Sequence, residues 1–459
     1  MTGASAEQTA ARVCTDSRQL RAGDVFVALR GERFDGHDFV AEACRKAAAV
    51  MIERSRPNVA GLEGCAAIRV DDTRKALGRL AARYRQDFSL PVIAVAGSNG
   101  KTTTKELIAS VLNRKLATLS SESSFNNDVG VPATLLRLES AHQAAVIEAG
   151  TNHPGELAPL VRMIRPATGV ITSIGREHLE FFEDLEGVAR EEGWLAELLP
   201  GDGKLLVNGD EPWGDALIRR SRAGPVRVGF GDGNDWRAHS TRLEKQGVKF
   251  CVEAPVAGYS GEYRVSLLGR HQALNSLFAI AVGAELGLTR QQIEQGLAEC
   301  KPPRMRMQLW EVNGVRVLDD TYNANADSVA AALQTMKELP CQGRRVAVLG
   351  DMAELGKHSE AAHEEVGRRA AELGIGQLFA VGKMAAVVAR GARAAGLTRV
   401  LEFQDLQTAG SAIKQFVKEG DLLLLKASRV ARLERIAELL KAGEPSWKNH
   451  AGSNGKQCS

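Results

Sequence analysis

Residues 91–112, PVIAVAGSNGKTTTKELIASVL, constrain the fold of this chain more than any other segment. The segment opens with five apolar residues, 92–96, whose β-branched side chains predict a buried parallel strand. A glycine-rich turn follows and leads directly into a helical pattern of apolar residues. Such a turn directs the free N–H groups and the partial positive charge of the helix at one point. The segment therefore predicts a phosphate-binding loop within an α/β sheet.

The turn carries the side chains that a nucleotide triphosphate needs. Lys101 supplies a positive charge for the β- and γ-phosphates, and Thr102 supplies a hydroxyl for Mg²⁺. Val95 stands where the general motif has its first glycine, so a plain strand–helix turn with an exposed lysine is the alternative. The order of strand, turn, GKTT and helix favours the nucleotide, and we expect Lys101 to lie at the surface. The predicted phosphate loop consists of Gly97, Ser98, Asn99, Gly100, Lys101, Thr102 and Thr103.

The composition bounds the class of protein. A chain of 459 residues is too long for one core, and about three domains are expected. The net charge of +3 gives no reason to expect a nucleic acid or a membrane surface as partner. No apolar run is long enough to span a bilayer, so no membrane insertion is expected. The seven cysteines form no CxxC pair, which predicts reduced thiols in the cytoplasm and no zinc site. We expect a monomer.

The order of elements predicts an α/β chain of three domains. A small first domain contains a predicted helix at 39–48. The central domain continues from the phosphate loop as a parallel sheet and ends with an antiparallel ribbon at 236–268 and a long helix. Strands and helices alternate in the last domain, as in a Rossmann-like doubly wound sheet. The predicted domains are residues 1–88, 89–303 and 304–442, followed by residues 443–459 as a disordered tail.

Polar side chains follow two further strands of the predicted central sheet. Glu148 ends the strand at 144–148, and His178 follows the strand at 169–174. Ligands bind at the carboxyl ends of strands in doubly wound sheets, which favours both side chains as Mg²⁺ ligands beside the phosphate loop. The alternatives are a capping acid at Glu148 and a structural histidine at His178.

Polar loops predict further ligand contacts. Asn126 and Asn127, in the segment SSESSFNNDVGVP, suit a ligand rich in amides or hydroxyls, although an Asx-turn loop is the alternative. The cluster that contains Ser17 and Arg18 suits a sugar nucleotide or a turn with solvated charges. In the last domain, polar clusters follow three strands and are expected to face one crevice. These clusters are residues 319–325, 350–352 and 426–429.

Seven motifs together resemble the Mur ligases, the ATP-dependent amide-forming enzymes of peptidoglycan synthesis, over nearly the whole chain. The combination of SFNN-x-x-G-x-P with D-x-Y-N-A-N is similar to the branch that adds D-alanyl-D-alanine to UDP-N-acetylmuramoyl-tripeptide. The DNPR string, usual in the sister branch that adds a diamino acid, does not occur. The motifs are GSNGKTTTKE, SFNNDVGVPATLL, VIEAGTNHPGEL, LLGRHQALN, DDTYNANADS, GDMAELG and KASR.

The resemblance implies a role for each matching residue. ATP would contact the phosphate loop, with Asn275 against the adenine, Arg304 at the phosphates and Asp320 at the ribose. Lys101, Glu148 and His178 would be catalytic, the last two through a second Mg²⁺. Ser17 and Arg18 would take part of the uridine nucleotide. The residues expected near the peptide or the incoming dipeptide are Asn126, Asn127, Asn323, Asn325, Lys426 and Arg429.

The implied chemistry needs no covalent protein nucleophile. A substrate carboxylate attacks the γ-phosphorus of ATP, and the amine of the dipeptide then attacks the resulting acyl phosphate. Phosphoryl transfer depends on positioning and charge neutralisation. The acyl phosphate must be shielded from water, which is a physical reason for three domains that close on one site. The alternatives are a folylpolyglutamate-synthase-like ligase and, from another class, a P-loop switch protein.

One position departs from the family. Mur ligases generally carry a lysine in the helix after the His178 position, where CO₂ converts it to a carbamate that helps bind the second Mg²⁺. Here that residue is Glu192, with Glu191 beside it. Glutamate conserves the charge but ends roughly 3–4 Å nearer the backbone. Our hypothesis is that Glu192 replaces the carbamate, through a bridging water, a helix set closer or a displaced metal. The alternative is a solvated helix residue.

Overall fold

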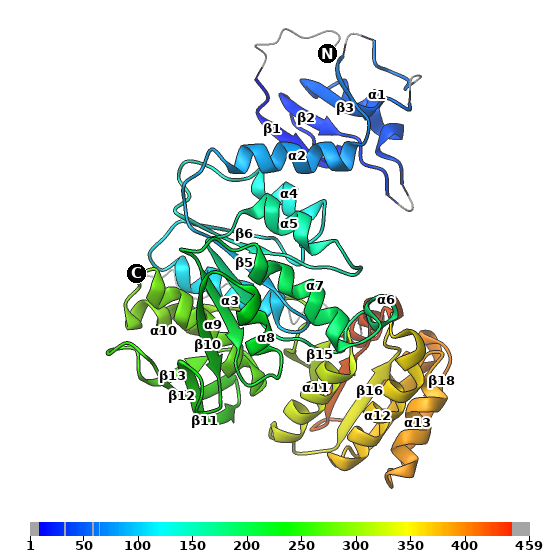
Figure 1. Cartoon of the computed structure of the whole chain (residues 1–459). Coiled ribbons are helices and arrows are strands. Elements are labelled where there is room, and N and C mark those ends of the chain that lie inside the picture. Colours follow the sequence, from blue (N-terminus) through cyan, green and yellow to red (C-terminus); the bar gives the residue numbers. More distant parts are fainter. Residues whose placement is uncertain (1–8, 32–33, 57–58, 64, 443–459) are drawn as a thin grey trace, which may run out of the picture.

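The structure is a computed structural model of the chain, and it describes residues 9–31, 34–56, 59–63 and 65–442. Three β-sheets follow one another along the chain, each with its own helices (Figure 1). The α/β class and the three-domain architecture predicted from the sequence are confirmed. The predicted tail, 443–459, lies outside the described residues. No helix of the described part is long and apolar enough to cross a bilayer.

The N-terminal sheet has four parallel strands in sequential order. Helix α1 covers one face, and α2 covers the other through Ala76 and Leu77, which pack against Val27 and Met51. The predicted helix at 39–48 is wrong in length, because α1 ends at Ala43 and turns follow. The elements are β1 (Arg12–Cys14), η1 (Ser17–Gln19), β2 (Asp24–Val27), η2 (Gly36–Phe39), α1 (Val40–Ala43), β3 (Ala49–Glu53), β4 (Ala66–Val70) and α2 (Thr73–Arg85).

The central sheet has nine strands in the order β13-β12-β11-β10-β9-β8-β5-β7-β6, and the predicted antiparallel ribbon forms β11–β13. Helices α3, α9 and α10 pack on one face, and α4, α5 and α7 on the other. The elements are β5 (Val92–Ala96), α3 (Lys101–Leu112), β6 (Thr118–Ser120), α4 (Gly130–Leu135), β7 (Ala144–Glu148), α5 (Leu157–Ile164), β8 (Thr168–Ile171), α6 (Leu179–Phe182), α7 (Leu185–Glu197), β9 (Lys204–Asn208), α8 (Gly214–Arg220), β10 (Gly224–Gly229), β11 (Trp236–Glu244), β12 (Gly247–Glu253), β13 (Gly261–Val265), α9 (His271–Glu285) and α10 (Arg290–Glu299).

The register of the central sheet brings three strand ends level. Val95 of β5 pairs with Glu148 of β7, and Ala96 pairs with Ile171 of β8. The loops after β5, β7 and β8 therefore leave the sheet at the same edge, as expected for parallel strands. This edge faces the C-terminal domain (Figure 1).

The C-terminal sheet has the order β14-β15-β19-β16-β17-β18, and all pairs except β14–β15 are parallel. Sequence reasoning missed β14. It pairs with β15 through a hairpin at Asn313 and Gly314, both at positive φ, and this Asn-Gly pair was an available signal. The elements are β14 (Gln308–Val312), β15 (Val315–Asp320), α11 (Ala326–Glu338), β16 (Arg345–Gly350), η3 (Gly356–His358), α12 (Ser359–Glu372), β17 (Gln377–Val381), α13 (Ala385–Ala394), β18 (Val400–Phe403), α14 (Leu406–Phe416), β19 (Leu422–Lys426), η4 (Arg429–Ala431) and α15 (Glu434–Lys441).

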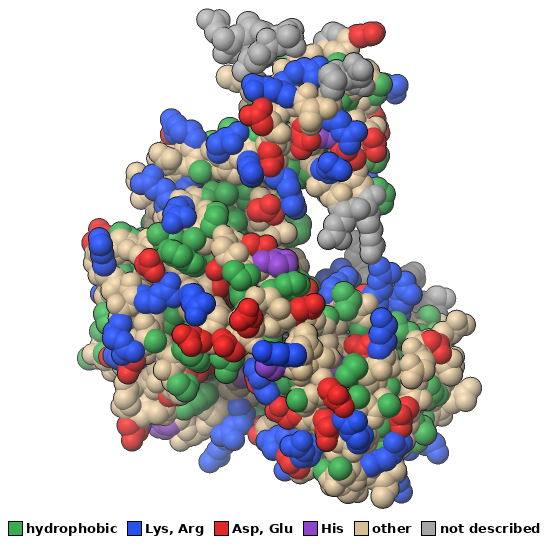
Figure 2. Space-filling view, turned by 45° about the vertical axis from the view of Figure 1, so that its right-hand side comes forward, with side chains coloured by type: hydrophobic (Ala, Val, Ile, Leu, Met, Phe, Trp, Pro, Cys, Tyr) green, Lys and Arg blue, Asp and Glu red, His purple; other side chains and the backbone are tan. Residues whose placement is uncertain are grey.

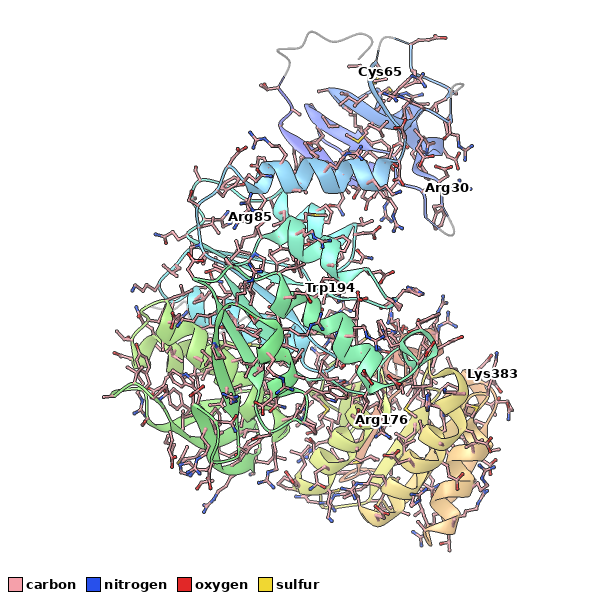
Figure 3. The ribbon with its side chains drawn as sticks, in the orientation of Figure 1. Arg30, Cys65, Arg85, Arg176, Trp194 and Lys383 are labelled. Atoms are coloured by element: carbon pink, nitrogen blue, oxygen red, sulfur yellow. The ribbon has the colours of Figure 1, made fainter. Side chains whose placement is uncertain are left out.

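Two short connections join the three sheets. The chain passes from α2 to β5 over residues 86–91 and from α10 to β14 over residues 300–307. Arg85, at the end of α2, donates to the carbonyl oxygens of Ile164 at 3.0 Å and Phe88 at 2.6 Å, which fastens this helix to the central domain (Figure 3). Acidic and basic side chains are interspersed over the face shown in Figure 2.

Candidate active site

A cleft of about 810 Å³ lies between the central and C-terminal domains. Its central wall consists of the loops after β5, β7, β8 and β9 and the first turns of α9, and its other wall consists of the loops after β15, β16 and β19. The two halves come from parts of the chain more than a hundred residues apart. Of the predicted site residues, those that line the cleft are Ser98, Asn99, Gly100, Lys101, Thr102, Thr103, Asn126, Glu148, His178, Asn275, Asp320, Asn323, Asn325, Lys426 and Arg429.

The phosphate loop requires glycine at two positions. Gly97 has φ of 110° and Gly100 has φ of 89°, in the left-handed region. A Cβ atom at Gly97 would lie 2.6 Å from the hydroxyl oxygen of Thr172, and one at Gly100 would lie 2.8 Å from Asn275 Oδ1. The loop therefore packs too closely for any larger residue, and Asn275 of α9 is held directly against it.

Lys101 is not the exposed lysine that the sequence predicted. Its side chain is only 13% exposed, and Nζ lies 3.3 Å from Glu177 Oε2 and 3.2 Å from the carbonyl oxygen of Ser98. Burial acts to lower the pKa of Lys101, but the carboxylates of Glu177, Glu192 and Glu148 outweigh it and raise the pKa above its ordinary value. Lys101 therefore stays charged among three acids.

These three acids each keep one buried oxygen without a hydrogen-bond partner. The oxygens are Glu148 Oε2, Glu177 Oε1 and Glu192 Oε1. The other oxygen of Glu148 accepts from Thr102 Oγ1 at 3.1 Å and from Asn126 Nδ2 at 2.9 Å. A buried carboxylate oxygen without a donor is costly, and two of these acids, Glu148 and Glu177, line the cleft, which suits a positively charged or hydrogen-bonding ligand.

The predicted metal ligands do not by themselves form one closed site. Within the described residues, no three His, Cys, Asp or Glu side chains are grouped closely enough to hold a metal ion. Glu148 and Thr102 contact each other, whereas Glu192 contacts Gly97 and His178 contacts the C-terminal domain. A cation at this edge would need donors from a bound ligand or from water.

Glu192 is not a solvated helix residue. It is 1% exposed, and its Oε2 accepts a hydrogen bond of 2.7 Å from the backbone N–H of Gly97. Burial raises the pKa of Glu192 above its ordinary value. Its neighbour Glu191 is also buried and accepts from the N–H groups of Gly155 and Leu157, each at 2.8 Å. Helix α7 thus holds the loops after β5 and β7 through two adjacent carboxylates.

His178 lies at the boundary between the domains. Its Nδ1 is 2.5 Å from Glu354 Oε2 of the C-terminal domain, and its ring packs edge-on against Phe182. The two asparagines of the loop at residues 126–127 make different contacts. Asn126 contacts Glu148, whereas exposed Asn127 accepts from the N–H groups of Val129 and Gly130 in an Asx turn, which is the alternative interpretation.

A buried ion pair forms the C-terminal wall of the cleft. Because Asp320 of β15 and Lys426 of β19 are partners in the parallel register, their side chains meet at 2.5 Å, and Lys426 is 2% exposed. Lys426 Nζ also donates to the carbonyl oxygen of Asn323 at 3.0 Å. Asn325 caps the N-terminus of α11 and donates to Asn99 Oδ1 of the phosphate loop at 3.0 Å.

Six predicted site residues do not line the cleft, and two of them, Gly97 and Glu192, contact each other. Arg304 is exposed, whereas Arg306 lines the cleft and stacks 4.0 Å over the ring of Tyr322. The expectation that residues 350–352 face the crevice is wrong. Asp351 instead accepts from the N–H groups of Lys383 and Met384, the two residues before α13, whereas the next residues of its loop, Ala353 and Glu354, line the cleft. The other positions are Asn127, Ser17 and Arg18, the last two in the N-terminal domain, where Arg18 pairs with Asp16 at 2.8 Å.

Sequence reasoning also missed an ion-pair contact between the two domains. Arg176 follows β8 and pairs with Asp327 and Glu365, each at 2.6 Å (Figure 3). Its backbone N–H donates to Asp327 as well, at 3.0 Å. A single arginine flanked by Gly175 and Glu177 has no pattern that marks it as an interdomain residue. The contact places the C-terminal domain directly beside Glu177, the residue that pairs with Lys101.

A phosphate loop that faces polar strand ends of a Rossmann-like domain defines a multidomain nucleotide-binding α/β protein of the ligase type. Three family descriptions match in order: "Mur ligase family, catalytic domain" at residues 10–85, "Mur ligase middle domain" at 95–283 and "Mur ligase, glutamate ligase domain" at 305–429. The chain belongs to the Mur ligase family.

Individual relatives are similar over nearly their full length. The UDP-N-acetylmuramoyl-tripeptide–D-alanyl-D-alanine ligase of Escherichia coli (strain K12) is 37% identical, with 95% of each chain covered. The ligase of the same name from Bacillus subtilis (strain 168) is 36% identical over 93% of this chain and 92% of its own. The crystal structure of MurF from Acinetobacter baumannii superimposes with a TM-score of 0.85 at 33% identity and covers 94% of this chain and 93% of its own. MurF ligase from Thermotoga maritima, in complex with ADP, has a TM-score of 0.81 at 28% identity, with 94% of this chain and 97% of its own covered.

Proposed function

We propose that this chain is an ATP-dependent ligase that joins D-alanyl-D-alanine to UDP-N-acetylmuramoyl-tripeptide. The observation that carries the proposal is the cleft, in which the phosphate loop faces the DDTYNAN strand end and Lys426. Relatives of that name, similar over nearly the whole chain, support it.

In this proposal the phosphates of ATP lie on the N–H groups of the phosphate loop, beside Lys101. The tripeptide carboxylate attacks the γ-phosphorus, ADP leaves, and the amine of D-alanyl-D-alanine displaces phosphate from the acyl phosphate. Lys101 stabilises the negative charge that spreads over the transferring phosphoryl group. Asp320 and Asn275 lie on opposite walls of the cleft, where one nucleotide can reach both.

The structure favours Arg306 over Arg304 for the phosphate contact, because only Arg306 lines the cleft. Its guanidinium is already oriented by the Tyr322 ring at 4.0 Å. Tyr322 in turn forms a hydrogen bond with Ser124 of the central domain. These contacts close the cleft on one side and help to exclude water from an acyl phosphate.

The donor set fits Mg²⁺. Three buried carboxylate oxygens without partners, on Glu148, Glu177 and Glu192, are the hard oxygen donors that this ion prefers. When bound, Mg²⁺ would neutralise phosphate charge and orient the γ-phosphoryl group. We propose Thr102 as a ligand of one Mg²⁺, and Glu148, His178 and Glu192 as residues that contribute to a second site.

Two other functions make different predictions. A folylpolyglutamate-synthase-like ligase would use an acid without a uridine nucleotide, and a P-loop switch protein would hydrolyse nucleotide without an amine acceptor. The test is ADP release from the full chain with UDP-N-acetylmuramoyl-tripeptide, with and without D-alanyl-D-alanine. We expect sustained release only when both are present. Equal release with ATP alone would overturn the proposal.

We also propose that the enzyme acts as a cytoplasmic monomer on these small molecules. The six cysteines among the described residues are all unpaired, which suits a reducing compartment. Light scattering after size exclusion should give the mass of one chain, and a dimer mass would contradict the monomer.

A further inference from the structure

Glu354 of the C-terminal domain contacts the predicted catalytic histidine of the central domain. His178 Nδ1 lies 2.5 Å from Glu354 Oε2, and the two residues are 176 positions apart. The histidine side chain is 13% exposed and the glutamate side chain 41% exposed. The pair therefore exists only where the two domains meet.

Both residues adopt a backbone conformation that side chains disfavour. His178 has φ of 50° and Glu354 has φ of 59°. Such conformations persist where the surroundings hold them, and they concentrate at functional sites. Here the two turns hold each other, because the N–H of Glu180 donates to the carbonyl oxygen of Glu354 at 3.0 Å. Helix α6, which starts at Leu179, lies beside the C-terminal domain (Figure 1).

The contact decides which ring nitrogen of His178 carries the proton. A carboxylate accepts a hydrogen bond, so Nδ1 must be the donor, and a neutral ring then leaves its lone pair on Nε2. Nε2 lies on the side of Glu177, 3.9 Å from its Oε2, and both residues line the cleft. A histidine that binds a ligand with one nitrogen commonly donates from the other to a carboxylate.

We propose that Glu354 is a positioning residue, which fixes His178 with its Nε2 lone pair toward the cleft only when the C-terminal domain is docked. Domain docking would then complete the central half of the site as well as bring in the C-terminal half. The inference rests on the proposed function for its kinetic part, whereas the state of the His178 ring can be measured without any substrate.

The direct test is the tautomer of His178 in the full chain labelled with ¹⁵N-histidine. Long-range ¹H–¹⁵N spectra distinguish the two tautomers, and loss of one signal in His178→Gln assigns it. We expect the proton on Nδ1 in the wild type and in Glu354→Gln, whose amide oxygen still accepts, and a shift to Nε2 in Glu354→Ala. A wild-type ring with its proton on Nε2 overturns the proposal whatever the variants do.

Kinetics supply the second readout. Glu354→Ala should lower kcat about 10–100-fold, with a smaller change in KM for ATP, and Glu354→Gln should recover much of the rate. The matched control is Glu365→Gln, which removes another interdomain carboxylate without touching His178. The control should keep the Nδ1 tautomer.

Each result of these kinetic measurements has a defined meaning. Glu354→Ala with wild-type kcat, or with a rate loss that Glu354→Gln does not relieve, contradicts the inference. Absence of ADP release by the wild type would instead contradict the proposed function and leave the tautomer result standing.

Discussion

Glu192 Oε2 accepts a hydrogen bond from the backbone N–H of Gly97 at 2.7 Å, although 95 positions separate the two residues. The carboxylate therefore reaches the phosphate loop itself, and its second oxygen, Oε1, remains buried without a partner. Glu192 thus supports the loop with one oxygen, and its carboxylate helps to raise the pKa of Lys101.

The hypothesis that Glu192 replaces the carbamoylated lysine of the family can be tested directly. If Glu192 supplies the negative charge that the lysine carbamate supplies elsewhere in the family, the enzyme needs no CO₂. Its activity should then be equal in CO₂-depleted and bicarbonate-supplemented buffer. Glu192→Ala should lose activity, and excess Mg²⁺ should restore part of it. Glu191→Ala is the control on the same helix, and its activity should not respond to Mg²⁺. A bicarbonate requirement in the wild type would refute the hypothesis.

Replacement of Lys101 should remove catalysis. Lys101→Met deletes the cation among Glu177, Glu192 and Glu148, and the loss of a group that stabilises the transition state commonly costs about 10²–10³ in kcat. The variant should also melt at a lower temperature, because the buried carboxylates lose their counter-charge. Steady-state ADP release and thermal unfolding check both effects. Lys75→Met, at an exposed lysine of α2, should change neither.

The Glu211 carboxyl should make stability depend on pH. Burial raises its pKa from 4.5 to about 7. The unfolded chain therefore loses this proton near pH 4.5 and the folded chain only near 7, so the folded state loses stability as the pH rises through this window. The shift corresponds to about 3 kcal/mol at most.

Glu211→Gln checks this prediction because it keeps the oxygen that accepts from the N–H of Ile174 at 2.8 Å. The variant should match the wild type in urea unfolding at pH 4 and exceed it in the free energy of unfolding at pH 8. An equal difference at both pH values would contradict the assignment.

Arg176 should hold the two catalytic domains together. Arg176→Met removes the pairs with Asp327 and Glu365, and the radius of gyration from small-angle scattering should increase while kcat falls roughly tenfold. The pairs are partly exposed, so each contributes about 1 kcal/mol or less and overall melting should change little. Arg390→Met, which breaks pairs within the C-terminal domain, is the matched control. An unchanged scattering profile would show that other contacts suffice.

The features that depend on neighbours along the chain could be predicted from the sequence alone. The strand, glycine turn and helix of residues 92–112 form a phosphate loop because Gly97 and Gly100 allow positive φ where a helix begins. Alternation of short apolar runs with helical patterns determined the α/β architecture for the same local reason. Residues that end parallel strands, such as Glu148 and Asp320, lie at the site because parallel strands share one ligand-binding edge.

Which of two nearby residues faces the site depends on the folded arrangement of the chain. Arg306 lines the cleft and Arg304 does not, because the positive φ values of Met305 and Met307 turn the backbone on both sides of Arg306. The burial of Glu192 and the meeting of His178 with Glu354 likewise depend on how α7 packs on its sheet and how the two domains dock. These contacts join residues about 95 to 176 positions apart, and no local pattern encodes such distances.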